Sequence, residues 1–136
     1  MSMPAGVYYV GDLCYVMTDK EWDEVCGITI SGSVCLEGEF QLKDGRRFTM
    51  YGTEWGDGVY RDQHGNEYSV DSGTIGCILM NDIVAEKYDD IQRLGTIVEI
   101  TEDFSTGGGR GTKEWDGVIR IGPIRIETSP EYEDYE

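Results

Sequence analysis

The side chains with the clearest chemical potential are two glycine-flanked aspartates and a nearby cysteine. Asp12 follows a glycine, Asp71-Ser72 precedes another, and Cys14 lies two residues after Asp12. Each aspartate interrupts strand-like sequence, so its carboxylate is expected at a strand end, where glycine permits a tight turn. Two interpretations remain open. The carboxylates cap their own turns, or they share one rim of a polar pocket at the end of a barrel, provided that their strands are neighbours.

A glycine-rich segment, Gly107 to Lys113, brings Arg110 and Lys113 close together in an otherwise acidic chain. A phosphate-binding loop of the P-loop type needs G-x-x-x-x-G-K-[ST] between a strand and a helix. Here the lysine follows the threonine, and a strand rather than a helix is predicted next. A hairpin loop is therefore expected, and the alternative is a loop that closes over an anionic small ligand.

The remaining polar residues do not form a recognisable catalytic or metal-binding pattern. The four cysteines show no C-x-x-C pair, and the single histidine, His64, lies in a predicted turn. Zinc binding, disulfides and Cys–His catalysis are therefore not expected, and the cysteines are predicted to be reduced and buried. Asp57 and Asp62 adjoin turns, where capping is the expected role, and the calcium-loop spacing is absent. We predict no cofactor.

Aromatic residues gather in the first half of the chain, near the glycine-rich turns at 52–58. Most are expected in the core, and some are candidates for a pocket or an interface, because Tyr and Trp supply rigid contact area. They are Tyr8, Tyr9, Tyr15, Tyr51, Trp55, Tyr60 and Tyr68.

The charge balance limits the partners that this chain can take. Eleven basic and 27 acidic residues give a formal net charge of −16, which repels phosphate backbones and anionic membranes. Direct binding of nucleic acid or membrane is therefore not expected. A partner with a basic surface is favoured, and simple solubility is the alternative explanation. Neither a secretory signal nor an apolar membrane span is evident, so a cytoplasmic location is expected.

The elements that must position these residues are mainly strands. Thr18 and Glu21 form a capping box ahead of a short amphipathic helix that Gly27 is expected to end. From 28 onward an alternating period predicts hairpins, a buried strand at 74–80, and short strands at 118–121 and 124–127. A second short helix is possible within 83–94. We predict one mainly β (α+β) domain over 1–128, an antiparallel sheet or partly open β-barrel, and an acidic, disordered tail at 129–136.

Two stretches together resemble a known group of proteins. Val10-Gly-Asp-Leu-Cys-Tyr-Val16 and, later, Gly65-Asn-Glu-Tyr-Ser-Val-Asp-Ser-Gly73 are similar to the GDPCY and Y-x-V-D-[SA]-G elements of small proteins from bacteriophages, large DNA viruses and some bacteria. Leu13 stands where that pattern has proline. The resemblance implies a viral or mobile-element origin and a setting in the host cytoplasm, and it carries over no activity.

Three functions follow as hypotheses. The first is a non-enzymatic acidic protein, in the manner of a phage accessory factor, that binds and inhibits a host defence protein. The second is a small-ligand binder that sequesters a nucleotide signal in a tyrosine-lined pocket. The third is an enzyme that uses Asp12, Cys14 or Asp71. No catalytic or metal-binding residue is assigned, and the candidate binding residues are Asp12, Cys14, Tyr15, Tyr51, Trp55, Asp57, Tyr60, Asp71, Ser72, Arg110 and Lys113.

Overall fold

The computed structural model describes residues 3–31, 34–54, 56–88, 94–108 and 117–128. Its strands are β1 (Gly6–Gly11), β2 (Ile30–Ser31), β3 (Val34–Cys35), β4 (Gly38–Gln41), β5 (Arg47–Gly52), β6 (Gly58–Asp62), β7 (Glu67–Val70), β8 (Thr74–Leu79), β9 (Gly95–Ile100), β10 (Thr106–Gly107), β11 (Val118–Ile121) and β12 (Ile124–Glu127). Among these residues the α-helix with described bounds is α1 (Asp19–Thr29), and the short 3₁₀ turns are η1 (Leu13–Tyr15), η2 (Met80–Asp82) and η3 (Ala85–Lys87).

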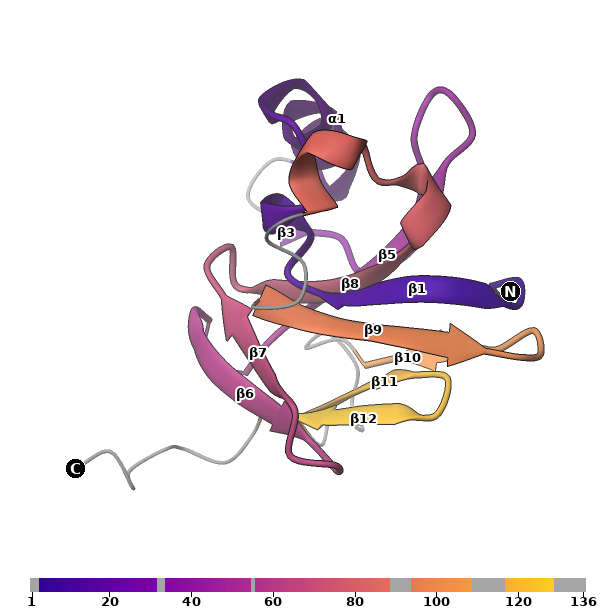
Figure 1. Ribbon diagram of the computed structural model, residues 1–136. Helices are drawn as coiled ribbons and strands as arrows, with labels where there is room; N and C mark the ends of the chain where they lie inside the picture. The colour runs from indigo at the N-terminus through magenta and orange to yellow at the C-terminus, as the bar shows by residue number, and fades with distance from the viewer. Residues whose placement is uncertain (1–2, 32–33, 55, 89–93, 109–116, 129–136) are drawn as a thin grey trace.

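Two five-stranded antiparallel sheets form the body of the protein. The first has the order β4-β5-β8-β1-β9 and the second the order β10-β11-β12-β6-β7, with β2 and β3 as a separate small hairpin. The sheets pack face to face beneath α1 (Figure 1). Their edges approach each other where β7 lies near β9 and β10 lies near β4, but they do not close into a barrel. The predicted mainly β fold with one short N-terminal helix is confirmed.

Successive side chains of the strands in the first sheet point to opposite faces, and they fill two separate hydrophobic cores. On β1, Tyr8 and Val10 face the second sheet, whereas Tyr9 faces α1. The core between the sheets also receives Ile119, Ile121, Ile124 and Ile126 from the β11–β12 hairpin. Because the first sheet is covered on both faces, its central strands read as almost continuous apolar sequence.

Helix α1 begins as the sequence predicts and ends two residues later than expected. The Thr18 hydroxyl accepts from the Glu21 amide, and the Glu21 carboxylate accepts from the Thr18 amide, so the capping box is confirmed. The predicted end at Gly27 is wrong, because the helix continues to Thr29. The Thr29 hydroxyl donates to the Val25 carbonyl at 2.9 Å, and Ile28 packs on the core below.

Three predicted features fall wholly or partly outside the described residues. The possible second helix at 83–94 coincides in part with η3, and residues 89–93 are not described. The predicted tail at 129–136 also lies outside the described residues, as does most of the glycine-rich loop, including Arg110 and Lys113.

Candidate functional site

The Asp12 carboxylate is fully buried and connects two distant turns. Its Oδ1 accepts hydrogen bonds from the Cys14 amide at 3.0 Å and the Ser72 hydroxyl at 2.9 Å, and its Oδ2 accepts from the Asp71 and Ser72 amides, both at 2.7 Å. A carboxylate offers about four acceptor positions, and four donors occupy them here. Asp12 therefore joins the turn after β1 to the turn between β7 and β8, with no acceptor position left for a ligand.

Steric crowding explains why a glycine, Gly11, precedes Asp12. The ring of Tyr9 lies across Gly11, so that a Cβ added at Gly11 would approach the Tyr9 hydroxyl oxygen to 2.6 Å. That hydroxyl donates to the Asp12 carbonyl at 3.2 Å. The Gly-Asp pair thus makes room for Tyr9 and then closes the turn.

The structure brings Asp12, Cys14 and Ser72 together, but the Asp71 side chain is exposed. Cys14 is half-buried, and its pKa is raised by burial and by the nearby Asp12 carboxylate. A raised pKa keeps the thiol protonated and poorly nucleophilic at neutral pH. The arrangement suits a structural junction rather than covalent catalysis.

The tyrosines of the first half are mostly core residues. Tyr8, Tyr9, Tyr60 and Tyr68 are almost completely buried, and Tyr51 is 6% exposed. Their hydroxyls have partners: that of Tyr51 bonds Thr106 Oγ1 at 2.7 Å, and that of Tyr60 donates to the Gly56 carbonyl at 2.8 Å. Tyr15 is half-buried against the core beneath α1. Trp55 lies outside the described residues.

A second buried aspartate, Asp62, organises the β6–β7 turn. Its carboxylate accepts from the Tyr68 hydroxyl at 2.6 Å and from the His64 and Asn66 amides at 2.8 and 3.0 Å. Burial alone would raise the pKa of Asp62, but these hydrogen bonds outweigh it and hold the pKa below its ordinary value. Asp57, in contrast, is exposed near the start of β6.

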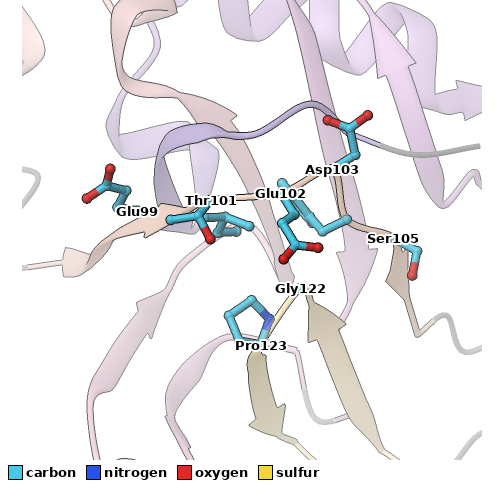
Figure 2. Close-up of a pocket in the computed structure, with 9 residues that line it drawn as sticks. Glu99, Thr101, Glu102, Asp103, Ser105, Gly122 and Pro123 are labelled. Carbon is cyan, nitrogen blue, oxygen red and sulfur yellow. The ribbon is translucent and has the colours of Figure 1, made fainter.

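An acidic hollow lies where the segment after β9 meets the β11–β12 turn. Its volume is about 460 Å³, and its lining comprises residues 99–105 together with Gly122 and Pro123. The Gly122 amide donates to the Ser105 carbonyl at 3.1 Å and fixes the two segments together. Figure 2 shows the Glu102 carboxylate directed toward the turn, with those of Glu99 and Asp103 pointing away at the rim.

Sequence reasoning missed this hollow. The alternating sequence at 96–104 is an ordinary strand signal and Gly122-Pro123 is an ordinary turn signal, and neither indicates that the two segments meet. The lining contains three carboxylates and no basic residue, and its apolar part comes from Ile100, Phe104 and Pro123. Such a surface can accept the apolar stem and the charged end of a lysine or arginine side chain.

The protein resembles no family model, and no curated protein or solved structure matches it. Among the described residues, no group of three His, Cys, Asp or Glu side chains is placed to hold a metal ion. No described helix is long and apolar enough to span a membrane.

Proposed function

We propose that this protein is a non-enzymatic binding protein that engages a basic surface of a protein partner, as a phage accessory factor would engage and inhibit a host defence protein. The acidic hollow carries the proposal. A side chain from the partner would lay its methylenes along Pro123 and Phe104 and direct its cationic end to Glu102. Glu99 and Asp103 would add attraction at the rim.

The net charge of −16 supports the same function at longer range. A strong field of one sign raises the rate at which oppositely charged proteins meet, by 10- to about 1,000-fold at low salt. The hollow then supplies the local contacts that distinguish one basic partner from another.

The experiment uses a lysine-rich peptide as the probe and compares two variants of equal charge. E99Q/E102Q neutralises the Glu102 carboxylate, which is directed toward the turn, and the Glu99 carboxylate at the rim. The control D23N/E86Q neutralises two exposed acids on α1 and η3. We expect the first to weaken peptide binding about tenfold, which corresponds to about 1.4 kcal/mol, and the control by less than about twofold. Equal losses in the two variants would reduce the effect to net charge and contradict the proposal.

An enzyme that uses Asp12, Cys14 or Asp71 has less support, because the Asp12 carboxylate is fully engaged and the Cys14 thiol is held protonated. The alternative of a nucleotide binder with a tyrosine-lined pocket also has less support, because Tyr51 and Tyr60 are core residues whose hydroxyls are engaged within the protein. Arg110 and Lys113 lie outside the described residues.

A further inference from the structure

Strand β9 is the last strand at one edge of the first sheet, beyond β1 (Figure 1). Its ladder with β1 runs along its whole length, from Gly95 opposite Gly11 to Ile100 opposite Gly6. Within the part of the chain that the structure describes, no strand pairs with the other side of β9, although β7 of the facing sheet lies near it. In an antiparallel ladder every second residue turns its N–H and C=O away from the partner strand. The outer side of β9 therefore presents backbone donors and acceptors along six residues, about 20 Å of chain.

Two apolar side chains are exposed beside this edge. Ile97 on β9 is 39% exposed, and Val7 on β1 is 42% exposed. Ile97 pairs with Tyr9, and Val7 pairs with Glu99. Because residues two apart in a strand share a face, all four side chains lie on the face of the sheet that carries α1. Tyr9 is buried in the core on that face, so Val7 and Ile97 continue the apolar face beyond the cover of the helix.

The charges along this edge determine which kind of strand can join it. Glu99 follows Ile97 on the exposed face, and β9 leads directly into the acidic hollow that contains Glu102. A charged side chain on an edge strand discourages pairing with another copy of the same strand. A second copy of this chain would bring a second acidic edge and a further net charge of −16. A strand with basic side chains would be attracted instead, because opposite charges on paired strands stabilise a sheet.

We infer, building on the proposed function, that the basic segment of the partner binds as an extended strand that adds to the first sheet at β9. In this mode the backbone hydrogen bonds supply affinity and alternate side chains supply specificity. An apolar side chain of the added strand would lie opposite Ile97, and a basic side chain two residues away would lie opposite Glu99. The next basic side chain would reach Glu102 in the hollow. The segment is thus a strand of alternating pattern with one apolar end and one basic end.

The test measures backbone amide hydrogen exchange in the full chain with and without the peptide Lys-Thr-Lys-Thr-Val-Thr-Val. We expect every second amide of β9 to exchange about tenfold more slowly when the free peptide is at ten times its Kd. Two further peptides carry N-methyl groups on the odd or on the even residues, which removes one set of backbone donors and keeps the charge and side chains. One of these two should bind at least about tenfold more weakly, because it cannot donate to β9.

A matched pair of variants tests the contribution of the edge side chain. I97T keeps a β-branched residue on β9 and removes its apolar surface, and it should weaken binding of the unmethylated peptide about threefold. The control V59T makes the same kind of change at a side chain that is 43% exposed on β6, a strand with neighbours on both sides. Its effect should be under about 1.5-fold, because no added strand can reach β6 through an open edge.

The outcomes distinguish this inference from the proposed function. Peptide binding that leaves amide exchange in β9 unchanged would overturn the inference and leave the acidic hollow as the site. Equal losses in I97T and V59T, or full affinity of both N-methylated peptides, would also overturn it. Protection of β9 that grows with protein concentration in the absence of peptide would identify a second copy as the occupant instead. If neither this peptide nor the lysine-rich peptide binds, the proposed function fails as well.

Discussion

At the scale of single residues, the turn after β1 depends on one buried carboxylate. Asp12 is fully buried, and its four hydrogen bonds come from the Cys14, Asp71 and Ser72 amides and the Ser72 hydroxyl, beside the ends of β1, β7 and β8. A buried charge is tolerated when donors surround it in this way. Weakening this acceptor takes a hydrogen-bond partner from three backbone amides that hold the two turns together.

The substitution Asp12→Asn should therefore lower the free energy of unfolding by about 2–4 kcal/mol, because an amide NH₂ would face the amides that now donate to a carboxylate. Urea denaturation measures this loss. Asp71→Asn is the matched control, since its side chain is exposed and only its backbone amide contributes, and we expect a change of under about 0.5 kcal/mol. Similar losses in the two variants would contradict the assigned role of Asp12.

The Asp62–Tyr68 hydrogen bond predicts a pH dependence. Because the folded-state pKa of Asp62 is lowered, its contribution to stability is present above the ordinary aspartate value of about 4 and is lost as the pH falls through the lower folded value. Tyr68→Phe should destabilise the protein, and the difference from the parent should shrink as the pH is lowered from about 5 to 2. Tyr60→Phe loses a bond to a backbone carbonyl, so its effect should not change over that window.

At the scale of elements, two glycines differ in the space around their Cα atoms: Gly76 in a strand has no room for a side chain, whereas Gly27 in the helix does. Gly76 on β8 lies so close to β5 that an added Cβ would fall 1.7 Å from the Thr49 carbonyl oxygen. There the Thr49 hydroxyl accepts from the Cys77 amide at 3.0 Å, in place of a ladder bond. Gly27 lies within α1, where an added Cβ would meet nothing within 4 Å.

Alanine at these positions should have effects of opposite sign. Gly76→Ala should lower the free energy of unfolding by more than about 3 kcal/mol, because the Thr49 backbone must move. Gly27→Ala should raise it by about 0.5–1 kcal/mol through helix propensity. Thermal unfolding of both variants tests this, and a stable Gly76→Ala protein would show that the two strands are further apart than described.

The elements that could be predicted from the sequence are those with a strong local signal. The capping box at Thr18 and Glu21 and the paired strands around Gly122-Pro123 need only neighbours in the chain. The end of α1 could not be predicted, because Gly27 is a usual terminator and the contacts that extend the helix come from Thr29 and the core. Those contacts depend on tertiary packing.

At the scale of the whole molecule, charge repulsion opposes the folded state. A net charge of −16 on a chain of 136 residues makes the charges of the folded protein repel one another, and salt screens this repulsion over about 10 Å at 0.1 M. We expect the midpoint of thermal unfolding to rise when NaCl is increased from 0.02 to 0.5 M at pH 7. The rise should largely disappear near pH 4.2, the isoelectric point, and an equal rise at both values would point to a cause other than charge.

How well each contact could be predicted depends on how far apart its residues lie in the sequence. The pairing of β11 with β12 follows from the sequence by counting outward from the two-residue turn at Gly122-Pro123. The contact of Asp12 with Ser72 needed the assumption that two strand ends are neighbours. The acidic hollow required the meeting of residues 99–105 with that turn, a long-range event without a local signal.

The place of β1 in the first sheet has a consequence for biosynthesis. This early strand lies between β8 and β9. One of its edges stays unpaired until roughly 70 further residues have been translated and the other until roughly 90, which takes about 4–18 s at ordinary elongation rates. An apolar strand with open edges can pair with other nascent chains. The acidic residues that follow it, beginning in α1, would hold neighbouring chains on a polysome apart during that interval.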